Sequence, residues 1–400
     1  MKSISVIGTG YVGLPAALML ARAGHKVTGV DIDEEIVNAL NRGEMHIDEP
    51  ALKKILDEPE VRANLKASNT PAESDVFFIA VPTPILSREK IADLSYVVDA
   101  LESITPHLRK GNLVVIESTI PPLTCKEVVK PLIEKTGLIV GDDILLAHCP
   151  ERILPGDIFQ EIVYNDRLIG GIDKQSGEAA RDIYASFVKG KLVVTDVTSA
   201  EMAKLVENTF RDVNIALANE IADVCETIDA DPLEVIAMAN LHPRVNILQP
   251  GIGVGGHCIP IDPWFIKQVD PENAKLIFTA REINQARPAK IAANIRLAVA
   301  ELDGPEIALI GATYKANTND LRESPALEIY ESLHRDGYNV TVFDPIADDY
   351  PMTTLEDLAS KFDCIAILIE HDVIIEELAE KEAAIRQAMR NPLIMRFYTH

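Results

Sequence analysis

Cysteine is scarce in this chain of 400 residues, and the usual disulfide and metal-binding spacings of cysteine are absent. The five cysteines, at positions 125, 149, 225, 258 and 364, are odd in number and widely spaced, and none forms a CxxC pair. This argues against a disulfide framework and a zinc ribbon, and it fits a reducing compartment. No apolar run reaches the ~20 residues of a membrane-spanning helix. Residues 1–10 enter a strand without the charged and apolar regions of a signal peptide. The sequence predicts a cytoplasmic protein outside the membrane.

Basic residues are also in short supply. Lys and Arg number 38 against 62 Asp and Glu, which gives a formal net charge of -24. Such a balance argues against nucleic acid or an anionic membrane as the main partner. A small anionic substrate stays possible, because a local group of Arg and Lys can override the average charge.

The N-terminal residues have the pattern of a dinucleotide-binding unit. A strand at 3–7 leads into Gly8, Gly10 and Gly13 in GxGxxG spacing, and a helix at 14–23 follows. The glycines allow a tight turn and the close approach of a pyrophosphate to the helix N-terminus. A second strand at 25–30 ends at Asp31, whose carboxylate suits a ribose diol and repels a 2′-phosphate. The pattern therefore predicts NAD rather than NADP.

Strands at 76–81 and 113–117, with a helix near 94–108 between them, extend this unit into a parallel doubly wound α/β sheet. Ligands bind such sheets at the carboxyl ends of the strands. Thr83 and Thr119 lie there and are candidates to contact the cofactor. The alternative is that both belong to ordinary strand-ending turns.

Glycine and proline are absent from Lys191 to Asp231. Thr198 and Glu201 have capping-box spacing, so a long helix is expected from there to about residue 228. Lys204, Asn208 and Arg211 would share one face of it. A solvated polar face is the alternative interpretation of that pattern.

One cysteine stands apart from the others. Cys258 lies in the glycine-rich stretch 253–263 and is followed four residues later by Asp262. A thiol in such a loop is a candidate nucleophile, whereas a free cysteine elsewhere is usually a small buried hydrophobe. Upstream, His242 and Arg244 flank a proline, and an arginine there suits a diphosphate. His242 has no second histidine at HxxxH spacing, so we expect no metal site.

The C-terminal region predicts a second, smaller Rossmann-like domain. Strands are expected at 306–310, 339–343 and 364–369, and helices at 326–335 and 354–361. It has no GxGxxG, so a different nucleotide is expected, with Lys315 and Arg322 as candidate ligands of its phosphates or its base. The predicted domains are residues 1–196, 197–300 and 301–400: an NAD-binding domain, a central long-helix domain and a nucleotide-binding domain.

Together these motifs resemble the UDP-glucose/GDP-mannose dehydrogenase family. Within the family, residues 242–250 and 262–265 look most like the UDP-N-acetyl-D-mannosamine dehydrogenases. The resemblance to the family as a whole runs from Met1 to about Ile369. It is carried by GTGYVGLP (8–15), VPTP (81–84), EST (117–119), CPER (149–152), EMAKLVENTFRDVNIALANE (201–220), GVGGHCIPIDP (253–263) and YKANTNDLRESP (314–325).

The resemblance implies a four-electron oxidation of a UDP-sugar at C6, through an aldehyde to an acid, with NAD. Cys258 would carry the thiohemiacetal and thioester. Lys204 and Asn208 would assist proton transfer and stabilise the oxyanion, Asp262 would be a base or orient water, and Glu151 would aid thioester hydrolysis.

The resemblance also implies the binding residues. The cofactor would contact Gly8, Gly10, Tyr11, Val12, Gly13, Asp31, Thr83, Thr119 and Arg322. The UDP-sugar would contact Arg152, Ile153, Lys204, Asn208, Arg211, His242, Arg244, Gly255, Tyr314 and Lys315. Family members associate through the central helix, so a homodimer or homotetramer is expected.

Two alternatives stay open. UDP-N-acetylglucosamine or UDP-glucose could be the sugar substrate. A catalytically silent protein that binds NAD or a UDP-sugar is the other alternative, because residues 391–400 lack the family's usual closing Asp-containing turn and basic residue.

Overall fold

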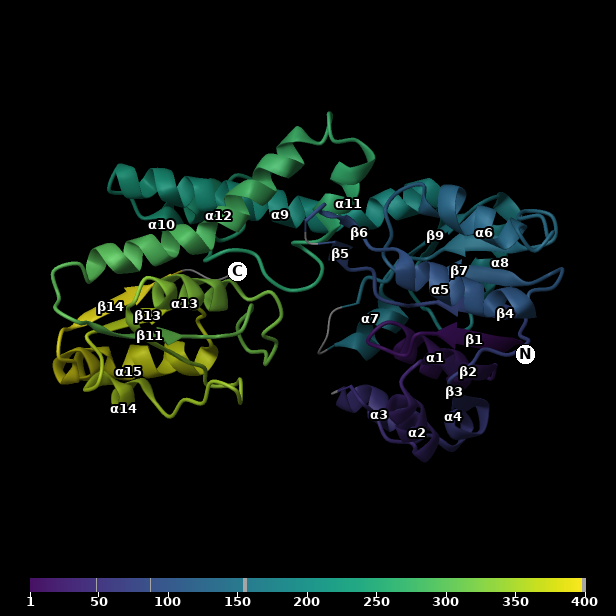
Figure 1. Cartoon of the computed structure of the whole chain (residues 1–400), viewed down its shortest axis with the longest axis horizontal. Coiled ribbons are helices and arrows are strands. Elements are labelled where there is room, and N and C mark those ends of the chain that lie inside the picture. The colour runs from purple at the N-terminus through teal and green to yellow at the C-terminus, as the bar shows by residue number, and fades with distance from the viewer. Residues whose placement is uncertain (48, 87, 154–156, 398–400) are drawn as a thin grey trace. The chain divides into compact units, whose positions relative to one another are not determined.

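The computed structural model describes residues 1–47, 49–86, 88–153 and 157–397. The chain divides into two compact units. Unit 1 contains Met1–Val206 and Trp264–Val269, and unit 2 contains Glu207–Pro263 and Asp270–His400. Both units have an α/β sheet, as the sequence predicts (Figure 1).

Unit 1 is built on an eight-stranded sheet in the order β10-β9-β8-β7-β4-β1-β2-β3. A separate two-stranded ladder is formed by β5 and β6. The strand bounds are β1 Ser3–Ile7, β2 Lys26–Val30, β3 Leu65–Ser68, β4 Val76–Ile79, β5 Ile85–Leu86, β6 Ile91–Ala92, β7 Leu113–Ile116, β8 Leu145–His148, β9 Arg167–Gly171 and β10 Leu192–Asp196.

Helices cover both faces of this sheet, and a separate apolar cluster lies on each face. One cluster packs around Leu14, Leu18 and Tyr184, and the other around Leu101, Ile104 and Val129. The helices are α1 Gly13–Arg22, α2 Glu34–Arg42, α3 Pro50–Leu56, α4 Pro59–Asn64, α5 Ser95–Ile104, the 3-10 turn Thr105–His107, the π-helical turn Cys125–Val129, α6 Lys130–Glu134, α7 Ile158–Tyr164 and α8 Lys174–Tyr184. This two-layer cover is the doubly wound arrangement expected of the sequence.

The sheet departs from the predicted parallel arrangement at one pair. Strand β8 pairs with β9 in antiparallel register, Ala147 opposite Gly171 and His148 opposite Gly170. The remaining neighbours in the eight-stranded sheet are parallel. The chain leaves β8 at its carboxyl end and enters β9 from that same end, which reverses the strand. Arg167, the first residue of β9, is thereby placed beyond the carboxyl end of β8.

The long helix α9 runs from Val197 to Thr227, close to the predicted span. Its N-terminus differs from the prediction. Asp196 is the cap, because its Oδ1 accepts from the Ser199 N–H at 3.0 Å. Glu201 does not complete a capping box with Thr198. Its carboxylate instead accepts from the N–H groups of Leu123 and Cys125. The predicted capping box is therefore wrong, because Asp196 caps the helix and the Glu201 carboxylate is occupied by N–H groups of a neighbouring segment of unit 1.

Helix α11, Asp262–Val269, starts in unit 2 and continues in unit 1. Its unit 1 part is held by the β5–β6 ladder. The Ala92 N–H donates to Gln268 Oε1 at 2.8 Å, and the Lys90 ammonium lies 5.8 Å from the centre of the Trp264 ring. Such an ammonium-over-indole contact is attractive.

Unit 2 contains a four-stranded parallel sheet in the order β12-β11-β13-β14. Its strands are β11 Glu306–Ile310, β12 Asn339–Phe343, β13 Cys364–Ile367 and β14 Leu393–Arg396. Its further helices are α10 Pro232–Asn240, α12 Lys275–Ala298, α13 Pro325–Arg335, α14 Leu355–Ala359 and α15 Asp372–Ala388. Apolar clusters on both faces of the sheet give this unit a core of its own.

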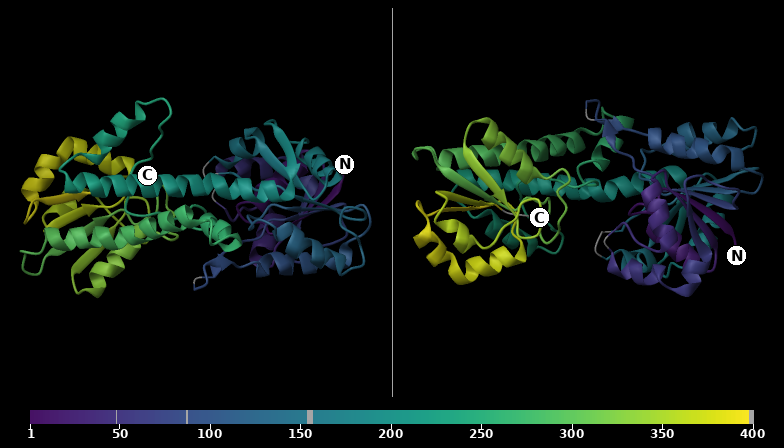
Figure 2. Two further views of the ribbon diagram at one scale, coloured as in Figure 1. Left: turned by 90° about the horizontal axis from the view of Figure 1, so that it is seen from above. Right: turned by 60° about the horizontal axis from the view of Figure 1, so that its bottom comes forward.

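Within unit 2, α12 lies beside α9 (Figure 2). Buried polar contacts join them: Arg281 pairs with Asp212, and Asn284 donates to Asp212 Oδ1 at 2.9 Å. Asn219 donates to Asn284 and accepts from the Gly251 N–H. Removing one partner of a buried ion pair is strongly destabilising, because the other charge is then left buried without a partner. These contacts therefore fix the chain at Gly251, just before the Cys258 loop.

Candidate active site

The three glycines of the turn after β1 have different surroundings: two pack tightly against other backbone atoms, and one faces open space. A Cβ on Gly13 would lie 1.9 Å from the Gly8 carbonyl oxygen, and a Cβ on Gly8 would lie 2.5 Å from that of Ala80. Gly8 also has φ +89°, which favours glycine. A Cβ on Gly10, by contrast, would have no other atom within 4 Å. Two of the glycines are required by the fold, whereas the middle one leaves open space at the N-terminus of α1.

Asp31 is held in a fixed orientation at the end of β2. Its Oδ2 accepts from the Thr9 N–H at 2.9 Å and from the Thr9 hydroxyl at 2.8 Å. Tyr11, in the same turn, is 43% exposed, and Val12 precedes α1 without a side-chain cap. Within the first turn of α1, Pro15 has no N–H and the Leu14 N–H donates to the Gly10 carbonyl at 3.0 Å, so this helix end attracts an anionic ligand mainly through its dipole.

Thr83 and Thr119 come together, as their positions after two neighbouring strands predict. The Thr83 hydroxyl donates to the Thr119 carbonyl at 2.6 Å. The loop after β4 also touches the glycine turn, because a Cβ on Gly8 would meet Ala80 and Val81. The predicted cofactor residues of unit 1 thus surround the carboxyl ends of β1, β2, β4 and β7. Open space at Gly10, the N-terminus of α1 and an oriented carboxylate at Asp31 together fit NAD.

Cys258 has the exposure that a nucleophile needs. It is exposed, whereas the other four cysteines are buried. Its carbonyl accepts from the N–H groups of Ile261 and Asp262, at 3.1 and 2.9 Å, which forms a tight turn into α11. Burial raises the pKa of the Cys149 thiol to about 12, so that thiol is a poor nucleophile.

Asp262, four residues after Cys258, is hydrogen-bonded to Asn208 of α9. Asn208 Nδ2 donates to Asp262 Oδ2 at 2.6 Å, and Asp262 is only 3% exposed. Lys204 precedes Asn208 by one turn of α9 and is also buried. Because α9 is continuous here, the predicted common face of Lys204, Asn208 and Arg211 exists.

Tyr314 lies across the glycines of the Cys258 loop. A Cβ on Gly256 would lie 2.9 Å from Tyr314 Cε2, and one on Gly255 would lie 2.7 Å from Tyr314 Cβ. Burial raises the pKa of the Tyr314 phenol, and Asp320 adds to the rise, whereas Arg322 and Arg211 oppose it. Cys258 is also close enough to influence it. The loop can pass beneath Tyr314 only because residues 255 and 256 lack side chains.

Arg322 belongs to the same cluster. It forms a two-point ion pair with Asp320, with Nε 2.8 Å from Oδ1, and its carbonyl accepts from the Gly256 N–H at 3.1 Å. Burial lowers the pKa of His257, and the Arg322 charge lowers it further. The predicted cofactor ligand Arg322 is thus found beside the Cys258 loop in unit 2, and its role toward the cofactor stays a prediction.

The other predicted residues lie in several places. His242 and Arg244 contact each other in an exposed loop, and Lys315 is exposed beside Tyr314. Ile153 packs against the core of unit 1. Arg152 Nη1 donates to the Asp166 carbonyl at 2.8 Å. Both carboxylate oxygens of Glu151 are engaged, one by the Arg152 N–H and one by the buried Arg167. The roles predicted for these side chains stay predictions.

Three family models match successive parts of the chain. They are the NAD binding domain, the central domain and the UDP binding domain of the UDP-glucose/GDP-mannose dehydrogenase family, at residues 2–188, 198–286 and 308–397. The chain belongs to the UDP-glucose/GDP-mannose dehydrogenase family. The predicted family, the α/β fold with a long central helix, the oxidoreductase class and the NAD cofactor are confirmed. The predicted domain ends at 196 and 300 stay predictions.

Relatives and solved structures agree with this family. The chain is 48% identical over 379 residues to a UDP-N-acetyl-D-mannosamine dehydrogenase of Methanococcus maripaludis, covering 93% of this chain and 87% of the relative. It is 43% identical over 385 residues to an NDP-N-acetyl-D-galactosaminuronic acid dehydrogenase of Ralstonia nicotianae, covering 92% and 91%. The solved UDP-D-ManNAc dehydrogenase of Pyrococcus horikoshii matches with a TM-score of 0.91 and 41% identity, covering 99% and 95%.

Two buried polar clusters of this dehydrogenase were missed by sequence reasoning. In unit 1, Glu117 accepts from the Tyr184 hydroxyl at 2.6 Å, and burial together with Glu151 raises the pKa of Glu117 to about 7. In unit 2, Asp344 and His371 meet beneath the Tyr314 loop. Glu117, Asp344 and His371 all follow a strand closely, and this position at the carboxyl edge is the signal that could have found them.

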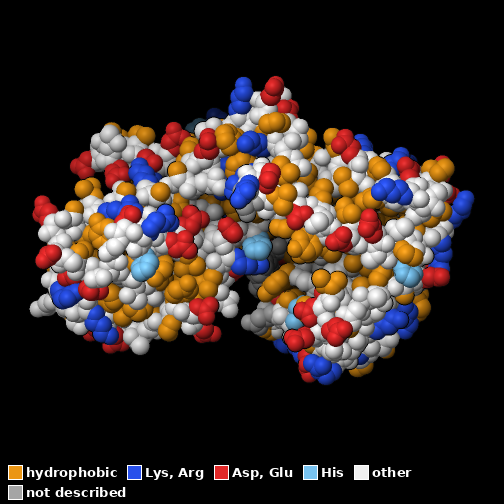
Figure 3. All heavy atoms as spheres, viewed as in Figure 1, with side chains coloured by type: hydrophobic (Ala, Val, Ile, Leu, Met, Phe, Trp, Pro, Cys, Tyr) orange, Lys and Arg blue, Asp and Glu red, His pale blue; other side chains and the backbone are white. Residues whose placement is uncertain are grey.

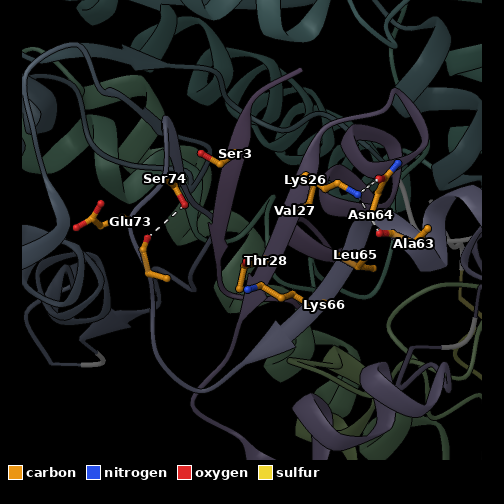
Figure 4. Close-up of a pocket in the computed structure, with 11 residues that line it drawn as sticks. Ser3, Lys26, Val27, Thr28, Ala63, Asn64, Leu65, Lys66, Glu73 and Ser74 are labelled. Atoms are coloured by element: carbon orange, nitrogen blue, oxygen red, sulfur yellow. Dashed lines mark hydrogen bonds between the residues drawn. The ribbon is translucent and has the colours of Figure 1, made fainter.

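Among the described residues, neither the face shown in Figure 3 nor the groove shown in Figure 4 gathers catalytic side chains. On the face shown in Figure 3, Lys and Arg are scattered among Asp and Glu. A groove of about 350 Å³ lies at the amino ends of β1, β2 and β3, away from the glycine turn, where Lys26 already donates to Asn64 and to the Ala63 carbonyl (Figure 4). Across the residues that the structure describes, no three His, Cys, Asp or Glu side chains gather as a metal site. None of the described helices is both long and apolar enough to cross a membrane.

Proposed function

We propose that this chain oxidises C6 of UDP-N-acetyl-D-mannosamine from the alcohol to the carboxylate, with two NAD consumed per sugar. One observation carries the proposal. Cys258 is the exposed thiol of the chain, and its glycine loop passes under Tyr314 in the unit that contains the matched UDP binding domain. A nucleophile beside a UDP site, in a protein that binds NAD, suits oxidation beyond the aldehyde.

The thiol is needed because an aldehyde is a poor hydride donor, whereas a thiohemiacetal carbon bears both a hydrogen and an oxygen that can assist its departure as hydride. The Cys258 thiolate adds to the aldehyde carbon, a C–S bond forms, and the carbonyl oxygen takes up a proton as a thiohemiacetal. NAD, when bound, would supply the oxidising power: one NAD would take a hydride from the alcohol, and a second NAD would take one from the thiohemiacetal. Water then adds to the resulting thioester, the C–S bond breaks, and Cys258 is released with the carboxylate. The four electrons removed from the sugar thus equal two hydrides.

Asn208, Asp262 and Lys204 are proposed to manage charge during these steps. The Lys204 ammonium, with the Asn208 amide, would stabilise oxygen atoms that become negative. Asn208 also holds Asp262 at 2.6 Å, so the carboxylate is oriented to accept a proton from water. Glu151 is proposed to aid thioester hydrolysis, with its ion pair to Arg167 setting its orientation.

Arg211, Tyr314 and Lys315 are proposed to bind the UDP-sugar, together with the remaining predicted ligands Arg152, Ile153, His242, Arg244 and Gly255. The side chains of Arg211 and Tyr314 are electrostatically coupled in unit 2, beside Cys258. An arginine near a diphosphate can form paired hydrogen bonds, and a tyrosine can stack or donate.

The identity of the sugar is supported by relatives named for UDP-N-acetyl-D-mannosamine, at 45–48% identity. The Ralstonia relative, at 43%, is named for a different N-acetylated sugar. UDP-N-acetylglucosamine and UDP-glucose, the alternatives left open by the sequence, are the competing substrates. A panel of these UDP-sugars compared by kcat/KM distinguishes them, and UDP-N-acetyl-D-mannosamine should give the highest value.

The stoichiometry of NADH tests the mechanism. Wild-type protein should form two NADH per UDP-N-acetyl-D-mannosamine consumed and release the acid. Cys258→Ser should lose acid formation, while Cys225→Ser, which removes a buried thiol, should keep the ratio of two. One NADH with free aldehyde as the wild-type product would contradict the mechanism. Tight binding of NAD and UDP-sugar without turnover would support the silent alternative instead.

We also propose that a second copy of the chain covers one face of α9. Phe210, Leu217 and Val224 recur at seven-residue intervals and are 60, 48 and 56% exposed. This stripe (the α9 stripe) is the pattern of a helix that packs against another helix. A homodimer or homotetramer through α9 would bury it. A cytoplasmic location is proposed as well, supported by five free cysteines.

A further inference from the structure

A buried polar cluster lies at the carboxyl edge of the unit 2 sheet. Thr313 follows β11, Asp344 follows β12 and His371 follows β13, and their exposed fractions are 0, 1 and 0%. These strands are neighbours in the sheet. A histidine and a carboxylate are expensive to bury without partners, so their hydrogen bonds decide what the cluster does.

The hydrogen bonds of His371 assign its tautomer. Asp344 Oδ2 lies 3.2 Å from His371 Nε2 and also accepts from the Ala312 N–H at 2.7 Å. Although burial alone would raise the pKa of Asp344, hydrogen bonds from His371 and from backbone N–H groups hold it well below its usual range. The carboxylate is therefore an acceptor, and Nε2 carries the proton. Nδ1 is left to accept, and it accepts from the Asn317 N–H at 3.0 Å.

Asn317 completes a two-way clamp with the chain at His371. While its N–H donates to His371, its own Oδ1 accepts from the Asp372 N–H at 3.1 Å. Asn317 has φ +60°, in the left-handed region that only glycine adopts without cost and that asparagine tolerates. Two hydrogen bonds thus hold a bend that the chain would not favour by itself.

The clamped loop, residues 313–317, contains Tyr314 and Lys315. Its near end is fixed to Asp344 by the N–H groups of Ala312 and Thr313. Its far end is fixed at Asn317. Tyr314, between the two anchors, lies across Gly255 and Gly256 of the Cys258 loop. A shift of the loop would therefore move Tyr314 against the backbone that leads to the nucleophile.

We propose that His371 is a positioning residue for the UDP site: by accepting from the Asn317 N–H it holds the 313–317 loop where Tyr314 and Lys315 meet the UDP moiety. The inference rests on the proposed function, because these two side chains are taken there as UDP-sugar ligands. His371 acts through the loop and contacts no substrate itself.

Two substitutions test the two ring nitrogens of His371 separately. In His371→Asn, an amide oxygen can replace Nδ1 and accept from Asn317. In His371→Gln, an amide nitrogen can replace Nε2 and donate to Asp344, but the acceptor for Asn317 is lost. We expect His371→Gln to weaken UDP binding about tenfold and His371→Asn to weaken it less than about threefold, as measured by titration calorimetry with UDP.

The readouts are chosen to separate positioning from general damage. NAD affinity should be unchanged in both variants, and KM for the UDP-sugar should rise in His371→Gln more than KM for NAD. The rate at which iodoacetamide modifies Cys258 should also change in His371→Gln, because a shift of Tyr314 alters the surroundings of the Cys258 loop. The readout is specific to Cys258, since the other four cysteines are buried. Equal UDP affinity in the two variants and in wild type would overturn the proposal, as would an equal loss in both.

A third variant keeps the test usable if a His371 variant does not fold. Asn317→Gly accepts the positive φ, keeps the N–H that donates to His371 and removes only the bond to Asp372. UDP binding should weaken by about threefold, and unchanged UDP affinity would count against the clamp. UDP titration needs no turnover, so failure of the proposed oxidation in wild type would leave this test readable.

Discussion

The glycines of the N-terminal turn differ in what a methyl group would cost. Gly13→Ala would drive a Cβ against the Gly8 carbonyl, whereas Gly10→Ala would enter open space. We expect Gly13→Ala to lower the free energy of unfolding by about 2 kcal/mol or more. Gly10→Ala should fold normally and bind NAD at least about tenfold more weakly, because the methyl occupies pyrophosphate space. Urea unfolding and NAD titration measure the two effects, and normal NAD affinity in Gly10→Ala would contradict the assigned cofactor site.

The buried Glu117 should make stability depend on pH. Burial, with the charge of Glu151, raises its pKa from 4.5 to about 7, so the folded chain binds this proton more tightly than the unfolded chain. The contribution is complete below pH 4.5 and is lost as the pH rises to about 7. The loss amounts to about 3 kcal/mol. In Glu117→Gln, whose side chain cannot ionise, this decline should disappear.

Unfolding free energies measured by urea between pH 5 and pH 8 test this expectation. The difference between Glu117→Gln and wild type should grow in favour of the variant as the pH rises. The exposed Glu102→Gln, in α5, serves as the matched control and should follow wild type. Parallel pH profiles for Glu117→Gln and wild type would show that Glu117 is ionised in both states.

At the scale of elements, the start of α9 depends on a residue outside the predicted capping box. Asp196→Ala removes the acceptor of the Ser199 N–H and should cost about 1 kcal/mol of stability. Thr198→Val should cost little or be stabilising, because the buried Thr198 hydroxyl has no hydrogen-bond partner. The urea midpoints of the two variants give the comparison. A larger loss of stability in Thr198→Val than in Asp196→Ala would support the capping box instead.

Elements with strong local signals agree well with their predicted positions. Strand β1 spans the predicted 3–7, and α9 ends within one residue of the expected 228. Their signals, a continuous apolar run and a long stretch without glycine or proline, depend on neighbouring residues only. The direction of β9 and the partners of Glu201 could not be predicted in this way, because distant segments supply them.

At the scale of the whole molecule, the α9 stripe should control assembly. Leu217→Glu places a charge in the middle of the stripe and should shift the protein toward monomer. Glu226→Ala, on the opposite side of α9, is the matched control and should keep the wild-type mass. Sedimentation or light scattering across a concentration series measures the change. A wild-type monomer at all concentrations, or an unchanged oligomer in Leu217→Glu, would contradict assembly through this stripe.

The sequence was sufficient to predict which types of residue form the candidate site, but not how these residues are arranged in space. Cys258, Asp262 and the glycine turn are recognisable from spacing, since their chemistry needs particular residues close together along the chain. The pairing of Asn208 with Asp262 and the position of Tyr314 over Gly255 and Gly256 join residues more than 50 positions apart. Only folding brings such residues into contact.

The sequence by itself determined the dinucleotide turn, the preference for NAD, the long helix and the glycine-rich setting of Cys258, because each depends on residues that are neighbours along the chain. The tertiary structure decided that β9 runs against β8, that Glu201 binds another segment instead of capping its helix, and that His371 supports the loop of Tyr314. These features depend on hydrogen-bond partners and strand ends that converge from distant positions, and a buried polar group takes whichever partner the fold brings within reach.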